Sequence, residues 1–170
     1  MSTHAEAKYR VRELTSDDAE AYRRLRLEAV ETRPSDYQTT PKSATTLPWE
    51  LQISASQLYK VFGVFDGDGL QGILGFRQLS NPKVRHKGIV WGMYLREEAR
   101  GTGMAEALME RVLAYAAERV DQVMLSVLAT NERAQAFFSK MGFERYGMEP
   151  HAMKIEGVYY DEVYMQKFLH

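Results

Sequence analysis

Cysteine is absent from all 170 residues of the chain, and this absence excludes three kinds of chemistry. The protein forms no disulfide, offers no thiolate to a metal ion and has no cysteine nucleophile. A chain without cysteine suits a reducing compartment, so we expect a cytoplasmic location.

Long apolar runs are missing as well. No stretch reaches the roughly 18–20 apolar residues that a membrane-spanning helix needs. Residues 1–8 lack the apolar core of a signal peptide. The formal net charge of -1 gives no general electrostatic reason to bind nucleic acid or an anionic membrane. We therefore expect a soluble protein that binds neither.

Metal-ligand patterns are also absent. No pair of histidine, aspartate or glutamate has the spacing of a metal site, so we expect no metal cofactor. The remaining composition is ordinary for a globular protein, with 45% hydrophobic and 26% charged residues. The length suits one domain over residues 1–170.

The first half of the sequence predicts strands around one helix. Alternation in Tyr9–Leu14 indicates a strand, and Thr15 with Asp18 forms a capping signal for a helix that ends near Thr32. One face of this helix carries the apolar side chains of Tyr22, Leu25, Ala29 and Val30. The other predicted elements are a loop at Arg33–Pro48, a short helix at Trp49–Gln57, and strands at Tyr59–Phe65 and Leu70–Phe76 joined by the turn Asp66–Gly69.

The second half predicts alternating strands and helices. In chain order they are a strand at Gly88–Leu95, a helix at Ala105–Val120, a buried strand at Val123–Leu128, a helix at Asn131–Met141 closed by Gly142, and a strand pair that turns at Glu156–Gly157 and returns along Tyr159–Phe168. This order is typical of a mixed α/β sandwich.

A glycine-rich turn, Arg100–Ala105, joins a predicted strand to a predicted helix. Such a turn leaves backbone N–H groups without partners at the positive end of the helix dipole, which favours an anion. Gly101 and Gly103 allow the backbone to approach a phosphate closely, and Arg100 adds a positive charge. The turn therefore predicts a site for a phosphorylated ligand.

Two familiar phosphate motifs fit this turn poorly. A P-loop needs Gly-Lys followed by Ser or Thr, which the turn lacks. A dinucleotide fingerprint needs a small residue at position 106, where this chain has Glu106, and it follows an early βαβ unit instead of several strands.

Arg100-x-x-Gly103-x-Ala105 resembles the pyrophosphate loop of the GCN5-related N-acetyltransferase (GNAT) family, whose pattern is Gln/Arg-x-x-Gly-x-Gly/Ala. Asn131–Phe143 resembles the second signature of that family, an asparagine followed by a small-residue helix and Gly-Phe. The elements between the two signatures and the closing segment 148–164 agree as well, so the resemblance covers nearly the whole chain.

This resemblance implies a GNAT-like α/β fold: a mixed, mostly antiparallel sheet of six or seven strands, helices on both faces and a splayed central strand pair. Acetyl-CoA would lie between the splayed strands, with no metal. The implied cofactor-binding residues are Met93, Tyr94, Leu95, Arg100, Gly101, Thr102, Gly103, Met104, Ala105, Asn131 and Phe138. Asn131 has a second interpretation as the N-cap of its helix.

The chain departs from the family at two catalytic positions. The tyrosine usual in the second-signature helix falls at Phe138, and the strand Gly88–Leu95 contains no acid. Tyr94 and Tyr164 are the candidate proton donors, with sheet packing as the alternative for each. Glu28, Glu162 and His151 are the looser candidates for the base.

The resemblance implies an acetyl-CoA-dependent N-acetyltransferase that acts on a primary amine of a small molecule or a protein. A non-catalytic acyl-CoA-binding or sensing domain of the same fold is the alternative, favoured by the missing tyrosine and glutamate. Tyr37, Trp49 and Trp91 are candidates for an acceptor pocket, with core or loop packing as the other interpretation. A sheet edge or the terminal hairpin offers a surface for a homodimer.

Overall fold

The computed structural model describes residues 9–36, 51 and 56–170. The strands are β1 (Arg10–Glu13), β2 (Tyr59–Asp66), β3 (Gly69–Gln78), β4 (Lys87–Leu95), β5 (Gln122–Leu128), β6 (Glu144–Ile155) and β7 (Val158–Phe168). The helices are α1 (Ala19–Thr32), α4 (Met104–Ala117) and α5 (Glu132–Lys140). Short 3-10 turns occur at Ser16–Asp18, Pro34–Asp36 and Glu97–Ala99.

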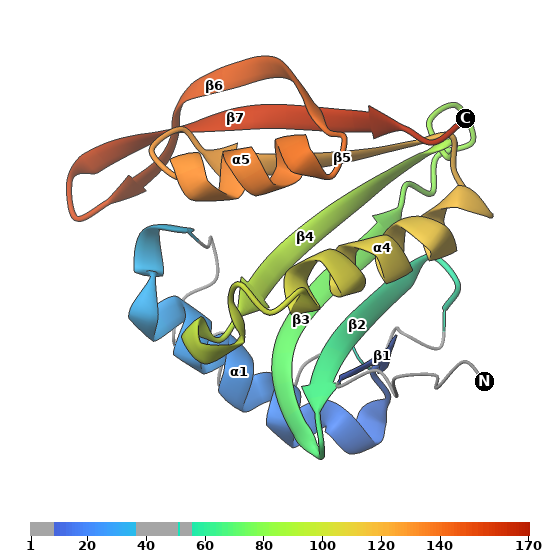
Figure 1. Ribbon diagram of the computed structural model, residues 1–170. Coiled ribbons are helices and arrows are strands. Elements are labelled where there is room, and N and C mark those ends of the chain that lie inside the picture. The colour runs from blue at the N-terminus through green and yellow to red at the C-terminus, as the bar shows by residue number, and fades with distance from the viewer. Residues whose placement is uncertain (1–8, 37–50, 52–55) are drawn as a thin grey trace.

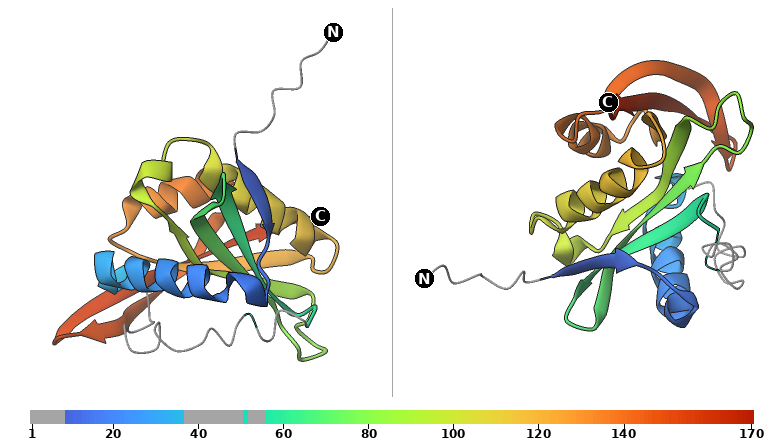
Figure 2. Two further views of the ribbon diagram at one scale, coloured as in Figure 1. Left: turned by 90° about the horizontal axis from the view of Figure 1, so that it is seen from below. Right: turned by 90° about the vertical axis from the view of Figure 1, so that its right-hand side faces the viewer.

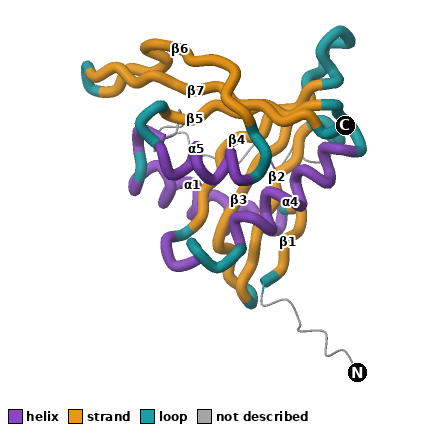
Figure 3. Tube along the Cα trace, turned by 45° about the horizontal axis from the view of Figure 1, so that its top comes forward, coloured by secondary structure: helices purple, strands orange, loops and turns teal. Residues whose placement is uncertain are grey.

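The strands form one seven-stranded sheet in the order β1-β2-β3-β4-β5-β7-β6 (Figure 3). Every neighbouring pair is antiparallel except β4 and β5, which are parallel. The predicted mixed, mostly antiparallel sheet is confirmed.

The parallel pair β4 and β5 is joined over a short length. Lys87–Ile89 pairs with Gln122–Met124, and no later residues of the two strands pair. Figure 1 shows β4 and β5 meeting near the C-terminus and diverging from there. The splayed strand pair is therefore present, and it divides the sheet into β1–β4 and β5–β7.

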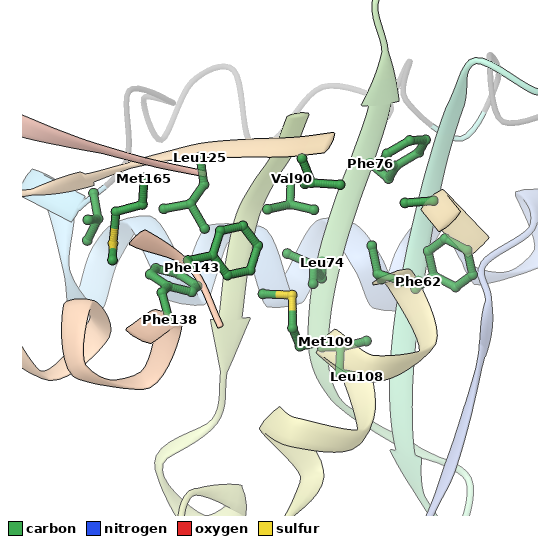
Figure 4. Packing of buried hydrophobic residues seen from close by; sticks show 14 of the residues in the cluster. Phe62, Leu74, Phe76, Val90, Leu108, Met109, Leu125, Phe138, Phe143 and Met165 are labelled. Atoms are coloured by element: carbon green, nitrogen blue, oxygen red, sulfur yellow. The ribbon is translucent and has the colours of Figure 1, made fainter. Parts of the chain in front are cut away.

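Helices cover both faces of the sheet. Neighbouring residues of β2 point to opposite faces, so that Phe62 and Val64 join the cluster under α4 while Val61 and Phe65 join the cluster under α1. Helix α5 lies on the same face as α4 (Figure 2) and contributes Phe138 to the larger cluster (Figure 4).

The capping signal before α1 is confirmed. The backbone N–H of Thr15 donates to the Asp18 carboxylate at 2.8 Å, and Asp18 also accepts two hydrogen bonds from the Arg12 guanidinium. These bonds, the Arg12 pair foremost, lower the pKa of Asp18. The expected apolar face of α1 is buried at Tyr22, Leu25, Ala29 and Val30.

Helix α4 ends earlier than the sequence predicted, at Ala117 instead of Val120. The N–H groups of Arg119 and Val120 both donate to the Ala116 carbonyl, so the chain turns before Val120. Val120 is buried nonetheless. Its apolar character extended the helical pattern, although the residue belongs to the turn that leads into β5.

The terminal hairpin follows the prediction. Its turn residues Glu156 and Gly157 both have positive φ, 49° and 84°, as a tight hairpin turn requires. Of the predicted short helix at Trp49–Gln57, Leu51, Ser56 and Gln57 are described, and Gln57 lies in a turn. The rest of that helix and most of the predicted loop at Arg33–Pro48 lie outside the described residues. None of the helices in the described part of the chain combines the length and apolar character of a membrane-spanning helix.

Candidate functional site

The divergence of β4 and β5 opens a cleft of about 340 Å³ on the face that carries α4 and α5. Its walls come from both strands, from the loop between β4 and α4, and from α5. The lining includes Met93, Tyr94, Leu95, Arg100, Gly101, Ala105, Asn131 and Phe138, eight of the eleven residues expected to bind a cofactor.

The other three expected residues, Thr102, Gly103 and Met104, are not part of the cleft lining. Gly103 is the N-cap of α4 with a φ of 89°, and Met104 is buried in the core. The Thr102 hydroxyl donates to the carbonyl of Ala99, and the Met104 N–H approaches that hydroxyl at 3.4 Å. The Thr102 hydroxyl, the buried Met104 side chain and the positive φ of Gly103 fix the shape of the loop.

A bulge in β4 shapes the cleft edge. Gly92 has a φ of 65°, in the left-handed region that favours glycine, and the β3–β4 register shifts between Ile73 and Gly75. After Ile89, no residue of β4 pairs with β5, so this edge of β4 forms no strand-to-strand hydrogen bonds with it. Backbone donors and acceptors of β4 are therefore available to a ligand in the cleft.

The loop between β4 and α4 presents unused backbone donors. In the described part of the chain, the N–H groups of Gly101, Thr102, Gly103 and Ala105 donate to no protein acceptor. They lie at the N-terminus of the 14-residue helix α4, where the helix dipole is positive. This cluster of donors is chemically suited to phosphate oxygens.

Charged side chains surround the same loop. The lining contains the arginines Arg33, Arg100 and Arg133 and the acids Asp36 and Glu106. Arg33 pairs with Asp36 at 3.7 Å, and burial raises the pKa of Asp36 against the opposing effect of Arg33. The Arg100 guanidinium has no hydrogen-bond partner within the described residues, so it remains available to an anion.

Glu106 on α4 forms an ion pair with Lys140, the last residue of α5. Its carboxylate accepts from the Lys140 ammonium at 3.0 Å. Its own backbone N–H, followed by Lys140, lowers the pKa of Glu106. The carboxylate is therefore ionised and engaged by a cation instead of facing the unused donors of the loop.

Asn131 is the N-cap of α5, as one interpretation predicted. Its side-chain oxygen Oδ1 accepts from the Ala134 N–H at 3.1 Å. The same residue lines the cleft, and its Nδ2 group has no bond to the described chain. Phe138 also lines the cleft and packs against Phe143, with ring centroids 6.1 Å apart.

A second cavity, of about 310 Å³, lies at the same strand divergence and reaches α1. Trp91, expected as an acceptor-pocket candidate, lines both it and the cleft; Tyr37 and Trp49 lie outside the described residues. Glu162, one of the candidate bases, lines the second cavity and is 8% exposed. The two hollows share Asp36, Val90, Trp91, Gly92, Ser126, Val127 and Leu128.

Tyr94 joins β4 to α1. Its hydroxyl donates to Glu28 Oε1 at 3.0 Å, and Arg96 Nε donates to Glu28 Oε2 at 3.1 Å. Burial, followed by the Glu28 hydrogen bond, raises the pKa of Tyr94. Both oxygens of the candidate base Glu28 are thus engaged by neighbouring side chains.

Tyr164 and His151, the remaining candidates, lie on the terminal hairpin and line neither hollow. The Tyr164 hydroxyl donates to Glu149, which raises the pKa of Tyr164 to about 12. The His151 ring stacks on Tyr159 at 4.1 Å. Neither residue is brought to the cleft by this fold.

Several lining residues were not among the sequence candidates. A glycine inside a strand signals a bulge, so Gly92 could have been found from its position in Gly88–Leu95. Arg33 and Asp36 lack such a signal, because their role depends on where the end of α1 meets β4. Among the residues of the described ranges, no three acidic or histidine side chains gather as a metal site.

Comparisons with known proteins agree with this geometry. A family model described as an acetyltransferase (GNAT) domain matches residues 11–164. An uncharacterized N-acetyltransferase of Mycobacterium bovis is 46% identical over 56 residues, which are 32% of this chain and 36% of that protein. The aligned segment thus spans little more than a third of that relative.

Solved structures share the fold. An acetyltransferase of the GNAT family from Streptococcus pneumoniae superposes with a TM-score of 0.79 at 21% identity, covering 94% of this chain and 99% of that chain. A Salmonella typhimurium structure that contains its cofactor acetyl-CoA superposes with a TM-score of 0.80 at 16% identity, covering 96% of this chain and 95% of that one.

Proposed function

The chain belongs to the GNAT acetyltransferase family, and from this premise we propose that it transfers an acetyl group from acetyl-CoA to a primary amine. The observation that carries the proposal is the set of unused N–H groups at Gly101, Thr102, Gly103 and Ala105 at one end of the cleft between β4 and β5. The Salmonella relative with acetyl-CoA bound supports the choice of donor.

Different residues of the cleft would bind different parts of acetyl-CoA. The loop N–H groups and Arg100 would hold the pyrophosphate, where backbone donors, a helix dipole and a guanidinium act together. The open edge of β4 at Met93, Tyr94 and Leu95 would bond the pantetheine amides, and Asn131 Nδ2 would donate to the same arm. Phe138 would form an apolar contact beside it.

The thioester carbonyl would then lie at the divergence of the strands. A backbone N–H on the open edge of β4 would polarise it and stabilise the negative charge that develops on its oxygen. The neutral amine would attack the carbonyl carbon, so that the C–N bond forms, the C–S bond breaks and the nitrogen loses one proton to water. Phe138 has no ionisable proton to donate, so the departing thiolate would take a proton from water. The CoA thiol has a pKa of about 8–9, so its thiolate can leave without a protein acid.

A non-catalytic acyl-CoA sensor is the second candidate. The absence of a tyrosine at Phe138 and of an acid between Gly88 and Leu95 favours it. Both candidates require acetyl-CoA to bind in the cleft, and they differ in whether an amine consumes it.

Two assays on the full chain separate these functions. Calorimetry measures acetyl-CoA binding, with Gly103→Glu as the variant expected to lose it. A thiol-release assay with a panel of amines measures transfer. Binding with amine-dependent thiol release supports the enzyme; binding without release from any amine supports the sensor. No binding overturns both.

A further inference from the structure

Glu162 on β7 is the buried charged residue for which the fold supplies no partner. It is 8% exposed, and among the described residues no other charged or strongly polar side chain is buried to that degree. Its carboxylate forms no hydrogen bond or ion pair with any residue of the described chain. Neither of its oxygens is among the fully buried side-chain atoms that lack a partner, so the carboxylate reaches open space, and the cavity that Glu162 lines provides such space.

The surroundings of Glu162 do not compensate its charge. Glu149 lies directly across from it on β6, and Tyr164 follows two residues later on β7 with its hydroxyl donating to that same Glu149. Arg26 and Asp36 line the same cavity from the end that α1 provides. Arg26 donates to the Tyr22 hydroxyl and lies over the Trp91 ring, and no hydrogen bond or ion pair joins it to Glu162.

The cavity beside Glu162 adjoins the cofactor cleft. Glu162 pairs with Leu128, the last residue of β5, and Leu128 lines both hollows. Ser126, Val127 and the β4 residues Val90–Gly92 do the same. A group in the 310 Å³ cavity would therefore lie beside the place proposed for the thioester carbonyl, at the divergence of the strands.

The cavity has an apolar part and a polar part, the polar part formed by Arg26, Asp36, Ser126 and Glu162. The apolar residues come from four elements. They include Ala29 and Val30 of α1, Ile73 of β3, Ile89 and Val90 of β4, and Val127 and Leu128 of β5. A volume near 300 Å³ is at the low end for ligand pockets. Such a space suits a compact amine whose apolar body contacts these residues while its ammonium group faces the acids of the lining, Asp36 and Glu162.

We infer that this cavity is the acceptor site for a small apolar primary amine and that Glu162 is the catalytic base that removes its proton. The inference rests on the proposed function. A Glu162 oxygen accepts a proton from the ammonium, giving the neutral amine and a carboxylic acid that returns the proton to water. After attack, the nitrogen loses a second proton, and the thiolate takes one through water, so one amide, one thiol and one proton result.

Amines of different acidity test this role. Butylamine and 2,2-difluorobutylamine have nearly the same shape, but fluorine makes the second a much weaker base, so less of it needs deprotonation. Glu162→Gln should lower kcat/KM for butylamine about 10²–10⁴-fold, the usual contribution of a general base. The loss for the difluoro amine should be clearly smaller, and Glu162→Asp should retain part of the activity with butylamine.

Glu149→Gln is the matched control, because it removes a carboxylate from the position directly across the strand pair. It should leave both rates nearly unchanged, and all variants should keep the wild-type affinity for acetyl-CoA. Equal losses for the two amines in Glu162→Gln, or no loss, would overturn the role of Glu162. Transfer to an alanine tetrapeptide but not to butylamine would overturn the acceptor class while leaving the proposed function intact. Acetyl-CoA binding without transfer to any amine would overturn both.

Discussion

Tyr94 and Glu28 connect the cofactor strand to the first helix: the Tyr94 hydroxyl donates to Glu28 Oε1 across 3.0 Å. Tyr94 also lines the cleft, and its backbone belongs to the open edge of β4. The side chain therefore holds α1 against the strand on whose edge the proposed donor would bind, and its proton is already committed to a carboxylate.

Tyr94→Phe tests whether this hydroxyl acts in structure or in proton donation. The raised pKa makes Tyr94 a weaker acid than an ordinary tyrosine, so we expect kcat to change less than about tenfold. Loss of a hydrogen bond to a charged group should lower the free energy of unfolding by about 1–3 kcal/mol. Urea unfolding and steady-state kinetics measure both. A fall in kcat of a hundredfold or more with unchanged stability would identify Tyr94 as the proton donor instead.

Gly101→Ala tests the backbone cradle. Gly101 has a φ of 71° with open space around the position of a Cβ, and Gly67 in the β2–β3 turn has a φ of 59° with equally open space. Alanine in the left-handed region should cost about 1–2 kcal/mol of stability at either position. Calorimetry should show weaker acetyl-CoA binding for Gly101→Ala and none of this effect for Gly67→Ala. Equal acetyl-CoA affinities for the two variants would show that the loop does not belong to the binding site.

Arg100→Ala tests the pyrophosphate assignment. A charge-assisted hydrogen bond of about 1.5–3 kcal/mol predicts a loss of about 10–100-fold in acetyl-CoA affinity. Binding of S-acetylpantetheine, which has no pyrophosphate, should not change. Arg77→Ala removes the same charge from an exposed site on β3 outside the cleft lining and should bind both ligands as the wild type does. Equal losses for the two ligands would place Arg100 elsewhere along the cofactor.

Tyr164 predicts an alkaline dependence of stability. The Glu149 hydrogen bond raises its pKa to about 12 in the folded chain, against about 10 in an unfolded chain. Because the pKa is higher in the folded chain, the protonated Tyr164 hydroxyl contributes fully to the free energy of unfolding below pH 10. This contribution is lost as the pH rises toward 12. The difference in melting temperature between wild type and Tyr164→Phe should therefore narrow between these values. A constant difference across this range would show that the Tyr164–Glu149 bond does not persist in solution.

The architecture could be predicted from sequence because its signals are local. Alternation, the Thr15–Asp18 cap, the positive-φ turn at Gly157 and the Asn131 cap each depend on a few neighbouring residues. The predicted end of α4 was wrong because a local pattern also continued past it. Val120 fits the apolar period of the helix, and its burial in a turn depends on the strand that follows.

The sequence predicted the part of the candidate site that would bind the cofactor. It predicted the part that would bind the acceptor only incompletely. The Arg100–Ala105 motif is contiguous, so its donors were expected before the fold was known. The second cavity is assembled from α1, β4, β5 and β7, and Glu162 carries no motif that separates it from other acids of the chain. Its burial and its lack of a partner arise from the register of β7 on β5.

Transfer of a labelled acetyl group distinguishes an acetyltransferase from a domain that only binds acetyl-CoA. The wild-type chain is incubated with acetyl-CoA labelled with ¹³C in the acetyl group and with a panel of primary amines, and the products are followed by mass spectrometry and free thiol. The proposed acetyl transfer predicts labelled amide and free CoA thiol in equal amounts, dependent on both protein and amine. Bound acetyl-CoA that yields no labelled amide above the protein-free control with any amine would contradict it.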